Sequence, residues 1–200
     1  AVEINNTFYR MPRASVLEQW VASVPDDFRF VIKASRRITH FKRLNEPEEP
    51  LEYLLKNLEV MGEKLGAVLF QLPPNMRCDM ERLQKFVVML PDGFPAAFEF
   101  RHESWFNDDV YEVLKGHDMA LCHADAEEDE LPFVSTTNWG YLRLRKTGYE
   151  QSELEDWMQK TAGWRDAFVF FKHEDEAAGP RMANHYLQLA GEGTRGPVDQ

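Results

Sequence analysis

The chain has 200 residues, of which 44% are hydrophobic and 28% charged, and its formal net charge is -11. This length and composition are typical of one soluble globular domain with a sizeable core. The acidic balance argues against a general binder of nucleic acids or anionic membranes, because both need a basic surface on their partner. No apolar run is long enough to span a bilayer, and Cys78 and Cys122 form no CxxC pair. We therefore expect a cytoplasmic protein without a disulfide framework.

Short alternating segments and amphipathic segments follow one another along the chain. Strands are predicted over residues 1–9, 28–34, 67–72, 98–101, 119–125, 141–145 and 168–173. Helices are predicted over 15–24 and 48–64, after an N-cap at Asp79, around 110–114, after an N-cap at Ser152 and around 182–189. This alternation within one domain predicts a parallel sheet covered by helices.

Seven predicted strands favour an α/β fold, a TIM-barrel-like (β/α) barrel. The chain opens Ala1-Val2-Glu3-Ile4, without an initiator Met and as if within a strand, so we expect the first strand of the barrel to lie upstream. We expect a single barrel domain over residues 1–190 and a flexible tail over 191–200. A doubly wound open sheet is the alternative, but the sequence has no glycine-rich turn to hold a dinucleotide.

Polar side chains lie near the end of each predicted strand, on the face opposite its bulky apolar residues. In a barrel this face points inward, and the carboxyl ends of the strands build the active site. Four cations and three carboxylates in this set favour a small anionic ligand, phosphorylated or carboxylated. The alternative is a salt-bridge network that only stabilises the barrel. The set is Glu3, Asn5, Lys33, Gln71, Glu99, Arg101, Asp125, Arg143 and Lys172.

The leading hypothesis is a hydrolase that acts on this anionic ligand and needs no cofactor. Glu99 and Glu3 are the predicted general acid and base, since cationic neighbours would separate their pKa values. His40 and His102 follow strand ends and are expected to assist. Two aromatic residues just beyond strand ends, Tyr9 and Trp105, are expected to line the pocket.

Two further hypotheses follow from the same residues. A metal-dependent phosphoesterase or nuclease-like barrel would hold a divalent ion, because His123 precedes Asp125 by two residues and is assigned to the same inward face. No HExxH or similar motif supports this metal site. A non-catalytic barrel that binds a metabolite or a partner protein is the third hypothesis, and the sequence identifies no protein partner. The predicted metal ligands are Glu3, Glu99, His123 and Asp125.

Several of these segments together resemble the YecE-like family, a domain of unknown function. The resemblance implies a TIM-barrel-like fold whose first strand precedes Ala1, and it supplies no agreed reaction. Many relatives carry His-Gly where this chain has Arg145-Lys146, and paired asparagines where it has Lys172-His173, so a mechanism resting on those residues would not transfer. The matching segments are Glu3-Ile4-Asn5-Asn6-Thr7-Phe8-Tyr9, the Lys33 strand with Ile38-Thr39-His40, Phe70-Gln71-Leu72-Pro73, Glu99-Phe100-Arg101-His102 through Trp105, Tyr141-Leu142-Arg143-Leu144, and Phe170-Phe171-Lys172-His173-Glu174 before Gly179-Pro180.

Overall fold

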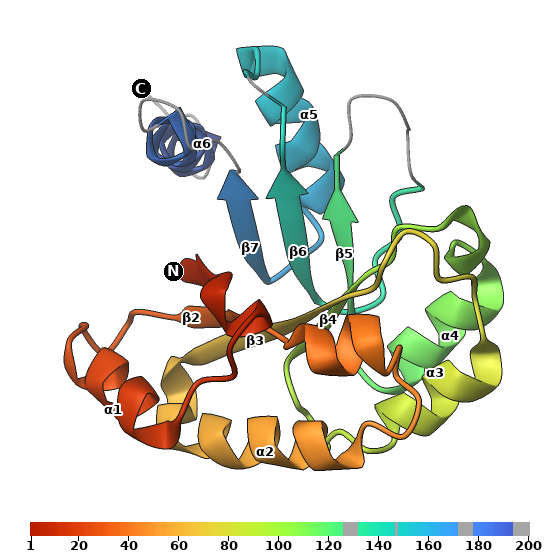
Figure 1. Cartoon of the computed structure of the whole chain (residues 1–200). Helices are drawn as coiled ribbons and strands as arrows, with labels where there is room; N and C mark the ends of the chain where they lie inside the picture. The colour runs from red at the N-terminus through yellow and green to blue at the C-terminus, as the bar shows by residue number, and fades with distance from the viewer. Residues whose placement is uncertain (126–131, 147, 172–177, 194–200) are drawn as a thin grey trace, which may run out of the picture.

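The computed structural model describes residues 1–125, 132–146, 148–171 and 178–193. Its centre is one parallel sheet in which each strand pairs with the next along the chain. Figure 1 shows the sheet curling into a nearly closed barrel, with β1 and β7 at its two ends and the helices outside. This confirms the α/β barrel, since a doubly wound sheet would reverse its strand order. The strands are β1 (Val2–Ile4), β2 (Phe30–Lys33), β3 (Leu65–Gln71), β4 (Ala96–Glu99), β5 (Ala120–Ala124), β6 (Trp139–Leu144) and β7 (Asp166–Phe171).

Six α-helices of the described chain connect or follow these strands, at the predicted places in sequence. The predicted cap of α3 is confirmed, because Asp79 Oδ1 accepts a hydrogen bond from the Arg82 backbone N–H at 3.0 Å. For α5 the prediction is wrong, because Glu150 caps the helix in a reciprocal box with Glu153, ahead of Ser152. The helices are α1 (Ala14–Ala22), α2 (Glu48–Leu58), α3 (Met80–Val87), α4 (Asp108–Gly116), α5 (Gln151–Thr161) and α6 (Ala178–Gly193).

Four short helical turns complete the description, and they alter some predicted boundaries. The strand predicted over residues 1–9 is shorter than expected and ends at Ile4. In the turn that follows it, the Thr7 hydroxyl lies 2.8 Å from the Ile4 carbonyl oxygen and 2.7 Å from that of Lys33. Helix α6 continues to Gly193, so residues 191–193 are helical, and the remainder of the predicted tail lies outside the described residues. The turns are η1 (Asn6–Phe8), η2 (Arg37–Phe41), η3 (Glu59–Lys64) and η4 (Glu103–Trp105).

Two cores lie on opposite sides of the strands. The larger one fills the space between strands and helices, where Phe70 and Phe98 stack at 5.4 Å and Phe86 of α3 packs against both. The smaller one fills the barrel interior with mostly small side chains. Alternation along each strand sends successive residues to one core and then the other. The fully or nearly buried members of the interior core are Val31, Ala67, Leu69, Ala97, Ala120, Cys122 and Tyr141.

The inward face predicted for β5 is wrong. Ala120 and Cys122 point into the barrel, whereas His123 lies on the helix side, with its ring 4.4 Å from that of Phe133 and 6.2 Å from that of Trp164. Alternation separates the two faces of a strand but does not say which one is inside. The narrow interior selects the alanine and cysteine of β5, and the imidazole joins the aromatic cluster outside. None of the described helices is long and apolar enough to cross a membrane.

Candidate functional site

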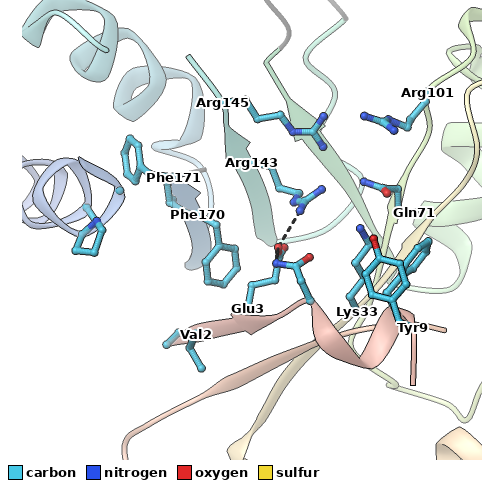
Figure 2. A pocket seen from close by; sticks show the side chains of 17 residues that line it. Val2, Glu3, Tyr9, Lys33, Gln71, Arg101, Arg143, Arg145, Phe170 and Phe171 are labelled. Carbon is cyan, nitrogen blue, oxygen red and sulfur yellow. Dashed lines mark hydrogen bonds and ion pairs between the residues drawn. The ribbon is translucent and has the colours of Figure 1, made fainter. Parts of the chain in front are cut away.

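A cavity of about 660 Å³ lies at the carboxyl ends of the strands, where β1, β2, β3 and β6 bring their last inward residues together. It also extends to β7 and the start of α6, through Phe170, Phe171 and Pro180. Figure 2 shows the guanidinium groups of Arg101 and Arg145 pointing toward one another across this mouth. The predicted site residues that line the cavity are Glu3, Asn5, Tyr9, Lys33, Gln71, Arg101 and Arg143.

Glu99 lies beneath the cavity floor, and its side chain is only 1% exposed. Its Oε2 accepts hydrogen bonds from Gln71 Nε2 at 2.8 Å and Arg143 Nη1 at 2.7 Å, and its Oε1 accepts one from Arg145 Nη2 at 2.6 Å. Arg101 Nε lies 3.6 Å from Oε1. Burial alone would raise the pKa of this carboxyl, but Arg143 and Arg145 outweigh it and hold the pKa below its usual range. Glu99 is therefore a fixed carboxylate, poorly suited to the predicted role of general acid.

Glu3 is the second carboxylate of the same network. Its Oε1 accepts from Arg143 Nη2 at 2.8 Å and Asn5 Nδ2 at 2.9 Å, and its Oε2 accepts from the Tyr141 hydroxyl at 2.5 Å. Burial by itself would lower the pKa of Arg143, but Glu99 and Glu3 together outweigh this effect and raise it. One guanidinium thus bridges two carboxylates from opposite parts of the sheet and closes the floor of the cavity.

Lys33 differs from the other cations around the cavity. Its Nζ lies 4.5 Å from the centre of the Phe8 ring, and the described residues place no hydrogen-bond acceptor on it. Burial is the main cause that lowers the pKa of Lys33 to about 8, and Arg143 adds to the effect. Near neutral pH this amine therefore exists in both the charged and the neutral form, which ordinary lysines do not.

His40, His102 and Trp105 were predicted at the site, and the structure does not bring them to the described lining of the cavity. His40 Nδ1 lies 2.9 Å from the Thr39 hydroxyl, and burial, then Lys33, lower the pKa of the ring. His102 Nδ1 accepts from the Ser104 backbone N–H at 3.2 Å and caps η4. Trp105 is fully buried, where it stacks on Phe100 at 4.6 Å. The positions of these three residues after strand ends are explained by local hydrogen bonds, helix capping and packing, and not by the cavity.

The four predicted metal ligands are not brought together. His123 lies outside the barrel wall, its Nε2 lies 3.1 Å from the Val134 carbonyl oxygen, and burial lowers its pKa to about 4. Asp125 accepts from the Arg145 backbone N–H at 2.5 Å and from the Tyr149 hydroxyl. Within the part of the chain that the structure describes, no three His, Cys, Asp or Glu side chains are grouped to hold a metal ion. The described residues therefore do not fit the metal-dependent hypothesis.

The predicted set left out several residues that line the cavity, among them Phe8, Phe170 and the charged residue Arg145. Arg145 also binds Glu99, although the strand β6 ends one residue earlier. The signal was present, because Arg143 and Arg145 share one parity in the alternating run that begins at Tyr141. The remaining predicted binding residue, Lys172, lies outside the described residues.

Comparison with known proteins places the chain in a family. The family described as protein of unknown function DUF72 matches residues 1–200. The UPF0759 protein YunF of Bacillus subtilis (strain 168) is 32% identical, over 94% of this chain and 82% of its own length. The UPF0759 protein YecE of Escherichia coli (strain K12) is 29% identical, over 92% of this chain and 79% of its own.

Solved structures show the same fold. A DUF72 family protein of Enterococcus faecalis V583 superposes with a TM-score of 0.81 at 22% identity, covering 95% of this chain and 89% of that one. Another, of Thermotoga maritima MSB8, gives 0.78 at 23% identity, covering 95% and 84%. At this identity the likeness concerns the fold alone. With the match over its whole length and with YunF and YecE as relatives, the chain belongs to the DUF72 family, as its resemblance to YecE-like proteins implied.

Proposed function

We propose that this protein is an enzyme that acts on a small anionic substrate, phosphorylated or carboxylated, bound in the cavity at the mouth of the barrel. The observation that supports this most is the local charge. Four cationic side chains surround two carboxylates, in a chain whose net charge is -11. A cleft of one sign attracts and holds ligands of the other sign. The cations are Lys33, Arg101, Arg143 and Arg145.

The cations differ in how much of their charge is available to a ligand. Arg143 is committed to Glu3 and Glu99 through both terminal nitrogens. Arg101, by contrast, contacts Glu99 only at 3.6 Å, and its side chain is 38% exposed. Arg145 is intermediate, because its Nη2 pairs with Glu99 Oε1 at 2.6 Å while its side chain remains 21% exposed. We therefore assign substrate binding mainly to Arg101 and Lys33, with Arg145 in a secondary role.

The chemical step is assigned differently from the sequence-based hypothesis. Hydrolysis remains a prediction. Glu3 and Glu99 are poorly suited to transfer protons in such a reaction, because both carboxylates are fully hydrogen-bonded. Lys33, with a pKa lowered to about 8, is the lining group best suited to act as base or nucleophile. A cytoplasmic location, where Cys78 and Cys122 would stay reduced, is part of this proposal.

The proposal is tested by thermal shift with phosphate, phosphorylated metabolites and small carboxylates. A ligand at a hundred times its Kd should stabilise the protein by about 2.7 kcal/mol, a shift of several degrees. The variant Arg101→Ala should lose this shift. Arg165→Ala is the matched control, since Arg165 pairs with Asp166 on the surface and is 71% exposed. Stabilisation by no anion, or a shift that survives in Arg101→Ala, would contradict the proposal. A non-catalytic barrel would bind the anion without turning it over.

A further inference from the structure

We propose that Lys33 forms a covalent imine with the carbonyl group of an anionic aldehyde or ketone bound in this cavity. The inference rests on the proposed function, because the same cavity holds the anion. It adds a nucleophile and narrows the substrate class to carbonyl compounds that carry a phosphate or carboxylate group.

The surroundings of Lys33 are those of a reactive amine rather than a structural one. Lys64, the comparison in this chain, has a side chain only 14% exposed, and its Nζ donates to the carbonyl oxygens of Val21 at 3.0 Å and Val24 at 2.9 Å. It also lies 3.4 Å from an oxygen of Asp26. The Nζ of Lys33 has no such acceptor among the described residues and lies at the cavity instead. These contacts explain why Lys64 is buried, and Lys33 makes no comparable contacts among the described residues.

Charged groups on several elements act on the Lys33 amine. Burial lowers its pKa most, and Arg143 on β6 and Arg101 after β4 lower it further. Glu99 and Glu3 oppose them and raise it, and the net result is a pKa of about 8. Only the neutral amine attacks a carbonyl group, so a lysine of this pKa is far more reactive at pH 8 than one near 10.4.

The cavity also offers the contacts that such a substrate needs. Arg101 and Arg145 line it together with Lys33, so the anionic group of a small molecule would lie between guanidinium groups while its carbonyl carbon faces Nζ. The Phe8 ring supplies an apolar wall beside the amine, and the Phe170 ring lines another part of the cavity. A half-buried amine beside such a wall is partly shielded from water, which favours the neutral nucleophile.

The covalent step balances without an oxidant or a reductant. The lone pair of neutral Nζ attacks the carbonyl carbon, a C–N bond forms, and a proton passes from nitrogen to the former carbonyl oxygen. A second proton, taken from solvent, allows this hydroxyl group to leave as water. The C–O bond is then broken and the protonated imine remains on Lys33. Hydration reverses every step and releases the amine.

The test is borohydride trapping on the full chain. The protein is incubated with pyruvate or dihydroxyacetone phosphate between pH 7 and 9, reduced with sodium borohydride, and analysed by intact mass and peptide mapping. The expected product carries the mass of the carbonyl compound less one oxygen atom, at Lys33, because hydride adds to the imine carbon. Lys33→Arg should abolish this labelling. Lys115→Arg should retain it, since Lys115 pairs with Glu112 at the surface.

Two comparisons separate this reaction from ordinary surface modification. Labelling of Lys33 should rise through about pH 8, whereas exposed lysines react appreciably only closer to 10.4. Arg101→Ala should slow labelling by pyruvate several-fold more than labelling by acetone, which carries no charge. Absence of a Lys33 adduct, or labelling spread over surface lysines and unchanged in Lys33→Arg, would overturn the inference. If anions still stabilise the protein in that case, the proposed function stands; if none does, both fail.

Discussion

The barrel interior has two layers, built by the same strands and the same inward faces, that differ in chemistry. In the lower layer β2, β3 and β4 contribute Val31, Leu69 and Ala97, all fully buried and apolar. Two residues further along each strand, the upper layer contributes Lys33, Gln71 and Glu99. The lower layer fills space as a barrel core must. The upper layer keeps polar and charged groups buried or half-buried, a costly arrangement unless these groups pair or meet a ligand.

Arg143→Ala is expected to have the largest effect, because it removes the cation that bridges Glu3 and Glu99 and leaves two buried carboxylates without their main partner. Breaking a buried ion pair from one side costs roughly 3–5 kcal/mol. Urea unfolding measures this loss, and the surface variant Arg165→Ala should lose less than about 1 kcal/mol. Equal stability of the two variants would mean that the upper layer contributes nothing to folding and would break the comparison of layers.

Leu69→Ala tests the lower layer. Leu69 is fully buried in the interior, so its truncation should cost about 2–5 kcal/mol through lost burial and the space left behind. Ligand stabilisation at the cavity should persist, measured as the same thermal shift added to a lower starting midpoint. Leu187→Ala on α6, where the side chain is 67% exposed, is the control and should change stability by less than about 0.5 kcal/mol. Loss of anion binding in Leu69→Ala would show that the two layers do not act separately.

Lys33→Met should have the smallest effect and the opposite sign. At pH 7 the folded protein holds Lys33 largely charged in a half-buried site, so an apolar replacement should raise the melting midpoint by a degree or more. Because the folded pKa of about 8 lies below that of the unfolded chain, the unfolded state binds more protons above pH 8. The free energy of unfolding of the wild type therefore increases relative to that of the variant as pH rises from about 8 toward 10. A midpoint difference that stays constant from pH 7 to 10 would contradict the lowered pKa of Lys33.

Much of the fold follows from local patterns in the sequence. All seven predicted strands are present, because alternation of apolar and polar residues marks a strand that separates two environments. The same alternation found most of the polar side chains that line the cavity, since residues of one parity near each strand end meet at one mouth. The predicted set contained Arg143 but not Arg145, although Arg145 ends the predicted strand 141–145 and shares the parity of Arg143.

The errors share a cause in tertiary packing. On β5 both faces are compatible with burial, and the narrow interior selected Ala120 and Cys122 over His123. Residues after strand ends were expected at the cavity, yet Trp105 donates its indole N–H to the Met76 carbonyl oxygen at 2.7 Å within the outer core. Position along the chain does not distinguish a pocket wall from a cap or a packing residue.

The sequence by itself determined the strand–helix order, the barrel class and the inward parity of β1 to β4 and β6, because these depend on periodicities that neighbouring residues establish. Only the tertiary structure decided which charges are committed and which are available. It joined Arg143 to both Glu3 and Glu99, which lie on strands far apart along the chain, and left Lys33 without such a partner among the described residues. Charges pair by distance in space, and closing a barrel sets distances between strands that no local pattern encodes.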